Sequence, residues 1–309
     1  MKTAKAFSPA GISSFFEICD TMPNGTPITD PEKIGARGGG FGFQKGVTTE
    51  VKVSEAEKTG IHIFINGRSA PEAETTRTVA EMLLERASEK YSVVVRHWVE
   101  VPIGAGFGSS AAGALTTALA LSKALGLNLT YNQLGKIAHI AEVKCKTGLG
   151  TVGPLMIGGC VITVEPGAPG IAQIDRIPIS EDYVIVAGFI GSIPTREVLA
   201  SHEKRLAVNK WGRKILEKIL AEPSLENFLA CCRWFAEKTG FTTERVRKLM
   251  EIAEEVGAVG AAQNMVGEAV HALATPENAE RVTQAFKRVL PKENVLVANV
   301  AVQGAKLLG

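Results

Sequence analysis

Pro102-Ile-Gly-Ala-Gly-Phe-Gly-Ser-Ser-Ala-Ala112 is the stretch around which the rest of the chain is organised. Residues 91–101 before it form a β-branched run that is typical of a buried strand. Residues 113–125 after it are rich in Ala and Leu and contain no Pro, which is typical of a helix. The sequence therefore predicts a strand, a glycine-rich loop and a helix in direct succession.

The loop has the chemistry of a phosphate-binding site. Gly104, Gly106 and Gly108 can adopt positive φ and carry no Cβ that would hold a ligand away. Ser109 and Ser110 are favourable N-cap residues for the helix, whose first N–H groups lack internal partners and carry partial positive charge. Such a helix start binds phosphate without a lysine, and the absence of Gly-Lys-Ser/Thr excludes a Walker A loop. A flexible turn before a capped helix is the alternative.

Length and composition are those of an ordinary globular protein with room for two domains. The 309 residues allow an ample core, and 45% of them are hydrophobic. A net charge of +2 gives no support for a nucleic-acid or anionic-membrane partner, and no apolar run approaches a membrane span. The first residues lack the apolar core of a signal peptide, and the five cysteines include no Cys-x-x-Cys pair. We therefore expect a cytoplasmic protein without disulfides or a cysteine-bound metal.

Two segments before the loop are candidate substrate contacts. Residues 9–19 are either a loop that enters the core, which the residue chemistry favours, or a substrate loop in which Ser13 and Ser14 donate hydroxyls. Arg37 lies inside the glycine cluster 35–42, where it can bind a carboxylate through two parallel hydrogen bonds. A solvated arginine in a β-turn is the alternative for this residue.

Glu142 is the candidate metal ligand. It falls near the end of a helix predicted over residues 132–143, where the helix dipole disfavours a carboxylate by about 0.3 to 1 kcal/mol. A magnesium ion would offset that cost, because hard cations prefer oxygen ligands. A surface glutamate is the alternative.

The remaining patterns define the domain organisation. The turn-rich residues 166–170 predict a boundary near residue 175, which divides the chain into domains 1–175 and 176–309. Gly148-x-Gly150-x-x-Gly153 matches the dinucleotide fingerprint in form, but we discount it because a helix precedes it instead of a strand. Further along, the periodicity predicts strands over 183–189 and 294–303 and helices over 224–238, 242–255, 267–273 and 276–289.

The central stretch resembles the Pro-x-x-x-Gly-Leu-Gly-Ser-Ser-Ala-Ala signature of the GHMP kinases, with Phe107 where Leu is usual. Other strings are similar to those of one branch, the archaeal pantoate kinases. They are Ala6-Phe-x-Pro9 with Ile12 and 15–18, Gly35-x-Arg37-Gly38-x-Gly40, Ala141-Glu142, Thr147-Gly-Leu-Gly150, Val164-x-Pro166-Gly-x-Pro169, Gly191-x-Ile-x-Thr195, and Gln263-Asn264-Met265 with Gly267. The resemblance spans nearly the whole chain.

This resemblance implies an α+β fold of two domains. The N-terminal domain would be ribosomal S5 domain 2-like and hold the phosphate loop, and the C-terminal domain would be ferredoxin-like. It also implies ATP-dependent phosphorylation of the primary hydroxyl of pantoate, or of a similar hydroxy acid, for coenzyme A synthesis. ATP and Mg²⁺ would be the cofactors.

The resemblance also implies roles for individual residues. Ser110 and Glu142 would hold Mg²⁺, and Thr151 and Thr195 would complete the catalytic set. Our own candidate for the acceptor carboxylate is Arg37. The loop residues expected around the ATP phosphates are Pro102, Gly104, Ala105, Gly106, Phe107, Gly108, Ser109, Ser110 and Ala111.

Three positions depart from the family pattern. Thr151 stands where an aspartate is expected, Thr163 where an arginine is expected, and Gly11 where a histidine is expected. Threonine can hydrogen-bond a hydroxyl but cannot remove its proton near neutral pH. The sequence thus leaves open a pantoate kinase, a GHMP kinase for another small alcohol such as mevalonate or homoserine, and a non-catalytic nucleotide-binding homologue. It also leaves a homodimer open.

Overall fold

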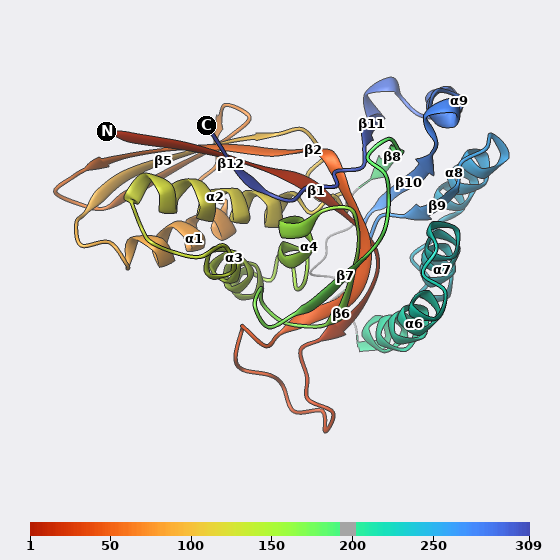
Figure 1. Cartoon of the computed structure of the whole chain (residues 1–309), viewed down its shortest axis with the longest axis horizontal. Coiled ribbons are helices and arrows are strands. Elements are labelled where there is room, and N and C mark those ends of the chain that lie inside the picture. Colours follow the sequence, from red (N-terminus) through yellow and green to blue (C-terminus); the bar gives the residue numbers. More distant parts are fainter. Residues whose placement is uncertain (192–201) are drawn as a thin grey trace.

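The computed structural model describes residues 1–191 and 202–309, and a large sheet forms the body of the first half of the chain (Figure 1). This eight-stranded sheet has the order β12-β1-β2-β5-β3-β4, with β6 attached to β2 and β7 to β6. Its pairs are antiparallel, apart from the parallel pair β3–β5. The strands are β1 (Lys2–Cys19), β2 (Gly35–Glu55), β3 (Gly60–Ile65), β4 (Arg68–Ser69), β5 (Tyr91–Val99), β6 (Cys160–Glu165), β7 (Gln173–Ile177) and β12 (Lys306–Leu308).

Strands β1 and β2 include two segments for which the sequence suggested a loop or a turn. Residues 9–19 continue β1 through two register shifts, so the expected loop is wrong. The glycine cluster 35–42 begins β2, so the alternative of a β-turn around Arg37 is also wrong. A Cβ at Gly40 would clash with the Ile12 carbonyl. The composition that suggested a turn therefore lets two bent strands pair closely.

Helices α1 to α4 cover one face of this sheet (Figure 1). Helix α2 packs on β1 and β2 and lies against α1 and α3. Its small and apolar residues are buried on nearly all sides, as expected for a central helix. The bounds are α1 (Glu74–Leu84), α2 (Ser109–Leu125), α3 (Tyr131–Cys145) and α4 (Val152–Ile157).

The second sheet has the order β11-β8-β10-β9 and is antiparallel throughout. Numbered along the chain, its strands lie in the order fourth, first, third, second, which is the ferredoxin-like arrangement that the resemblance implied. The elements are β8 (Val184–Gly191), α6 (His202–Ala221), α7 (Leu225–Lys238), α8 (Glu244–Glu255), β9 (Gly260–Gln263), β10 (Glu268–Ala274), α9 (Pro276–Val289), the 3₁₀ turn Lys292–Asn294 and β11 (Val295–Asn299).

One predicted helix is a strand. Residues 267–273 lie almost entirely in β10, which is buried along nearly its whole length. An apolar run buried on both faces has no period that separates a helix from a strand. The predicted domain boundary near residue 175 falls within β7, and β12 pairs with β1. The division into 1–175 and 176–309 stays a prediction.

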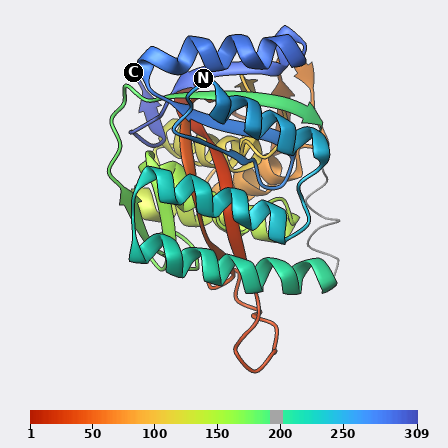
Figure 2. The same cartoon turned by 90° about the vertical axis from the view of Figure 1, so that its right-hand side faces the viewer.

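A shared hydrophobic core joins the two sheets. It contains aromatic side chains from β1 and β2 and from α7, which lies beside α6 across one side of the molecule (Figure 2). Phe15, for example, packs edge-on against Phe228, with 6.0 Å between the ring centroids. Phe107 of the glycine-rich loop also belongs to this core. The loop is therefore fixed to the interior of the protein.

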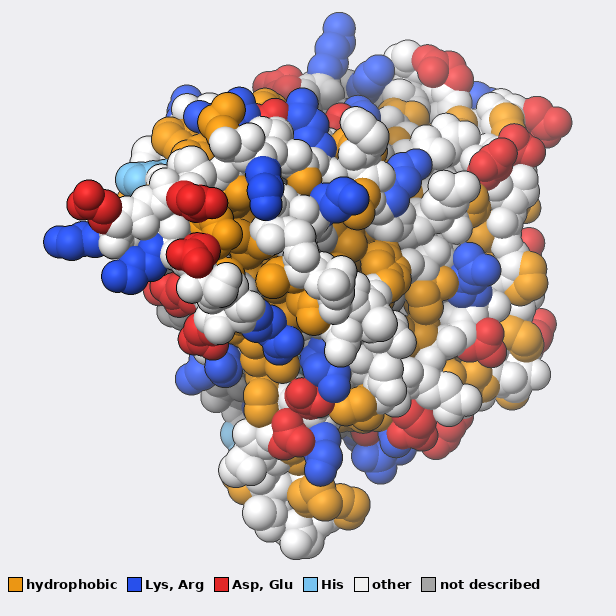
Figure 3. Space-filling model, turned by 60° about the vertical axis from the view of Figure 1, so that its left-hand side comes forward, with side chains coloured by type: hydrophobic (Ala, Val, Ile, Leu, Met, Phe, Trp, Pro, Cys, Tyr) orange, Lys and Arg blue, Asp and Glu red, His pale blue; other side chains and the backbone are white. Residues whose placement is uncertain are grey.

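The surface agrees with the modest net charge. Figure 3 shows positive and negative side chains interspersed over one face, without a large area of either sign. Among the described residues, no helix combines the length and the apolar character that a membrane crossing requires.

A buried polar network lies between β2, β5, α1 and α2. His97 is 3% exposed, with Nδ1 2.7 Å from Thr49 Oγ1 and Nε2 3.0 Å from Thr76 Oγ1. Thr49 Oγ1 also lies 2.6 Å from Thr116 Oγ1. Burial lowers the pKa of His97 to about 4, so the ring is neutral in the folded protein at neutral pH.

His97 should make the protein less stable as the pH falls. The unfolded chain protonates this ring near pH 6.5, whereas the folded chain does so only near pH 4. Lowering the pH from 7 to 5 should therefore remove about 2 kcal/mol of unfolding free energy through His97 alone. Urea unfolding at both pH values should show a smaller loss in His97→Gln. His62→Gln, at an exposed position, should keep the full loss; equal losses in all three proteins would contradict the prediction.

Candidate active site

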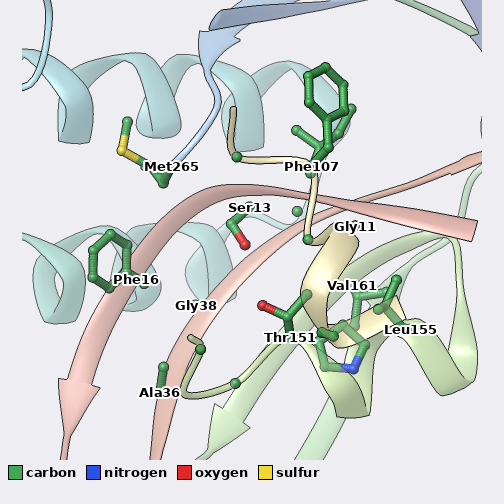
Figure 4. A pocket seen from close by; sticks show the side chains of 18 of the residues that line it. Gly11, Ser13, Phe16, Ala36, Gly38, Phe107, Thr151, Leu155, Val161 and Met265 are labelled. Carbon is green, nitrogen blue, oxygen red and sulfur yellow. The ribbon is translucent and has the colours of Figure 1, made fainter. Parts of the chain in front are cut away.

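One cavity lies where the glycine-rich loop, β1, β2, the segment before α4 and the turn between β9 and β10 meet. Figure 4 shows the hydroxyls of Ser13 and Thr151 directed into the same space, with Gly11 and Gly38 beside it. Much of the remaining wall is glycine or apolar side chain. A small ligand could therefore approach the backbone closely from several sides.

The loop joins β5 to α2, as the sequence predicted. Gly104, Gly106 and Gly108 have φ values of +79°, +76° and +60°. Gly108, and neither serine, is the N-cap of α2, so the expectation of a serine cap is wrong. Ser109 and Ser110 are the first residues of the helix, and no side chain caps it. The first amides of α2 are thus available to an anion.

The turn between β9 and β10 supports the loop from the other side. A Cβ on Gly106 would lie 2.9 Å from Asn264 Cβ, and a Cβ on Gly267 would lie 2.7 Å from the Ala105 carbonyl carbon. The Met265 amide donates to the Ser13 carbonyl at 2.7 Å. The loop and the turn therefore approach closely at both glycines, and the hydrogen bond ties the turn to β1.

Glu142 is buried beside the loop. It is 3% exposed, which excludes the alternative of a surface glutamate. Its Oε1 accepts hydrogen bonds from Ser110 Oγ at 2.5 Å and from Thr147 Oγ1 at 2.6 Å. Burial raises the pKa of Glu142, while these two hydrogen bonds act in the opposite direction. A carboxylate in such a place would gain strongly from a cation.

The donor set suits magnesium. Glu142, Ser110 and Thr147 present hard oxygen atoms at the cavity. Within the described ranges, no group of three or more His, Cys, Asp and Glu side chains could hold a metal by itself. Mg²⁺ is commonly bound by one or two protein oxygens and takes its other ligands from substrate phosphates and water.

The three positions that depart from the family pattern meet in this cavity. Gly11, Thr151 and Thr163 all line it. A Cβ at Gly11 would lie 3.1 Å from Thr151 Cγ2, so the two residues are direct neighbours. Thr163 is 5% exposed and faces Gly38 in the β2–β6 register. This end of the cavity therefore offers the hydroxyls of Thr151 and Thr163 where a carboxylate and a guanidinium were expected, and bare backbone at Gly11 where an imidazole was expected.

The other predicted residues are placed as follows. Ser13 and Arg37 lie in the cavity wall, whereas Ser14 does not. Ser14 falls at the register shift between Ser13 and Phe15 and is fully buried, with Oγ 3.0 Å from His271 Nε2. The loop residues Gly104, Gly106, Phe107, Gly108, Ser109, Ser110 and Ala111 line the cavity, but Pro102 and Ala105 do not. Thr195 lies outside the described residues.

Sequence reasoning missed several contributors. Met265 and Val266 of the β9–β10 turn line the cavity. Thr75 of α1 lies 3.0 Å from Thr147, with the distance measured between the Oγ1 atoms, and so extends the hydroxyl cluster at Glu142. Thr147 stands in a string that the sequence had singled out. No local pattern marks Thr75, because only the packing of α1 against α3 brings it there.

Comparisons with known proteins identify the family. The family model "GHMP kinases N terminal domain" matches residues 74–159. The pantoate kinase of Thermococcus kodakarensis is 38% identical over 91% of this chain and 90% of its own. That of Methanocaldococcus jannaschii is 29% identical over 95% and 99%. A solved structure described as "Phosphotransferase related to CoA biosynthesis pathway" matches with a TM-score of 0.87 and 32% identity, over 99% of this chain and 98% of that one. The chain therefore belongs to the GHMP kinase family.

Proposed function

We propose that this protein transfers the γ-phosphoryl group of ATP to the primary hydroxyl of pantoate, giving 4-phosphopantoate for coenzyme A biosynthesis. The contact between buried Glu142 and Ser110, at the start of α2, carries the phosphoryl-transfer part of the proposal. The choice of acceptor rests on the pantoate kinases that resemble the chain over nearly its whole length.

The loop and the helix start would bind the ATP phosphates through backbone N–H groups. Ser110 and Glu142 would hold Mg²⁺, and Thr147 would help to fix the Glu142 carboxylate through its hydrogen bond to the same oxygen, Oε1, that Ser110 binds. When bound, the ion supplies positive charge that stabilises the transferring phosphoryl group. The protein's own part is positioning, since the transition state is loose and needs little covalent assistance.

The acceptor would lie near Thr151 and Ser13, whose hydroxyls face the cavity. Thr151 can orient the attacking hydroxyl by a hydrogen bond but cannot take its proton near neutral pH. In a loose transition state the bond from the attacking oxygen to phosphorus is only slightly formed, so the hydroxyl does not have to be deprotonated first. Its proton can leave after the bond has formed. The absence of the expected aspartate is thus compatible with turnover.

A coupled assay of ADP release with ATP and Mg²⁺ tests the proposal. Pantoate should be the best acceptor in a panel with mevalonate, homoserine and small hydroxy acids, and the product should carry phosphate at the 4-hydroxyl. A higher kcat/KM for mevalonate or homoserine would assign a different kinase activity. Tight ATP binding without turnover of any acceptor would favour a non-catalytic homologue.

A further inference from the structure

Arg37 supplies the positive charge in the described wall of the cavity. Among the described residues that line the cavity, Arg37 is the single Lys or Arg, and Glu142 is the single Asp or Glu. Glu142 faces the hydroxyls of Ser110 and Thr147. An acceptor carboxylate therefore finds one cationic side chain in the described wall.

Arg37 is already held by two carboxylates. Its Nη1 lies 3.5 Å from Glu17 Oε2, and its Nη2 donates to Glu165 Oε2 at 3.2 Å. Glu17 faces Arg37 directly in the β1–β2 register, whereas Glu165 ends β6. A ligand that uses the guanidinium must replace one of these two partners or share the cation with them.

The two partners are held very differently. The Glu17 side chain is 5% exposed and also accepts from Arg213 of α6, at 2.9 Å from Nη2 and 3.3 Å from Nε. Removing Arg37 from Glu17 would leave a buried carboxylate with less compensation, which is costly. The Glu165 side chain is 54% exposed, and within the described residues it forms its ion pair with Arg37 alone. Water can solvate Glu165 at little cost once that ion pair breaks.

We propose that Glu165 is an internal competitor for Arg37, and that the acceptor carboxylate replaces it on Nη2 while Glu17, itself bound by Arg213, holds the guanidinium in place. This inference rests on the proposed function, because it concerns how that site binds the carboxylate of its acceptor. Glu17 is then a positioning residue, Arg37 is the specificity-determining residue, and Glu165 weakens the binding of every carboxylate acceptor by a constant factor.

Titration calorimetry with pantoate, in the presence of a non-hydrolysable ATP analogue and Mg²⁺, tests the exchange independently of turnover. Glu165→Gln should bind pantoate about two- to fivefold more tightly, which is the contribution of one exposed ion pair. Arg37→Met should bind it about 10- to 100-fold more weakly. Neither change should alter the affinity for the primary amide of pantoate, which has no carboxylate. Glu55→Gln, at an exposed position at the end of β2, is the matched control and should change nothing.

Kinetics provide the second readout. Glu165→Gln should lower the KM for pantoate by the same factor, with kcat and the KM for ATP unchanged. Equal pantoate affinity in Glu165→Gln and the parent, or equal losses for pantoate and its amide in Arg37→Met, would overturn the inference. Absence of pantoate binding in the parent protein would also overturn it. Pantoate binding that responds to both substitutions without phosphorylation would support the exchange and refute the proposed kinase activity.

Discussion

Replacement of Glu142 by glutamine should lower kcat by about 100- to 1000-fold and leave the unliganded protein as stable as before, or more stable. The loss follows because glutamine presents no negative charge to a cation beside the phosphates. The stability follows from burial, which raises the pKa of Glu142. An acid with a raised pKa in the folded state costs stability as the pH rises above its unfolded value, and glutamine removes that cost. The glutamine oxygen can still accept from Ser110 and Thr147.

Thermal unfolding with and without ATP and Mg²⁺ separates this prediction from simple damage to the fold. The parent protein should gain stability from the two ligands together, and Glu142→Gln should gain much less. Glu81→Gln, at an exposed position on α1, should behave like the parent in both assays. Turnover within tenfold of the parent would remove Glu142 from the active site. A large fall in the melting temperature at pH 7 would make its role structural.

Replacement of Gly106 by alanine should lower kcat/KM for ATP by about 100-fold or more. Gly106 has a φ of +76°, where an L-residue costs about 1 to 2 kcal/mol. The new Cβ would lie 2.9 Å from Asn264 Cβ and 3.1 Å from the Asn264 carbonyl carbon, so the loop or the β9–β10 turn must move. A shift of about 1 Å in a positioning site costs about 100-fold in rate.

Gly126 provides a matched control at the other end of the same helix. It is the C-cap of α2 with the same φ of +76°, and nothing lies within 4 Å of a Cβ placed on it. Gly126→Ala should therefore lower the free energy of unfolding in urea by a similar backbone strain energy, while ATP affinity and kcat remain those of the parent. Equal effects of the two substitutions on kcat/KM for ATP would show that backbone strain, and not the loop contact, is responsible.

The sequence was most informative where function depends on a local string. The sequence around residues 102–112 correctly predicted the strand before the loop and the helix after it. Glu142 could be singled out because the helix dipole disfavours a carboxylate near the end of a helix. The glycine cluster 35–42 was compatible with a turn because glycine is common both in turns and in strands whose backbones approach closely. Only the pairing with β1 shows that this cluster belongs to a strand. The strand over 268–274 was missed because burial on both faces removes its period.

Contacts between distant segments could not be predicted. Ser13 and Ser14 are adjacent and chemically identical, yet one lines the cavity and the other faces His271, because the pairing of β1 with β2 shifts register at this point. The ion pairs of Arg37 join β2 to β1 and β6, at separations of 20 and 128 residues that no local pattern encodes. The placement of Thr75 beside Thr147 depends in the same way on tertiary packing.

Phe107 has a consequence for the thermodynamics of nucleotide capture. Its side chain is 1% exposed and lies 6.0 Å from Phe43, measured between the ring centroids, so the loop's middle residue is anchored in the interior. Figure 4 shows the ring turned away from Thr151 and the open space. A segment already ordered by such an anchor loses little conformational entropy when a triphosphate arrives. The favourable contacts between the loop and the triphosphate are then not offset by the cost of ordering the loop. Affinity is set mainly by how well the loop amides align with the phosphate oxygens.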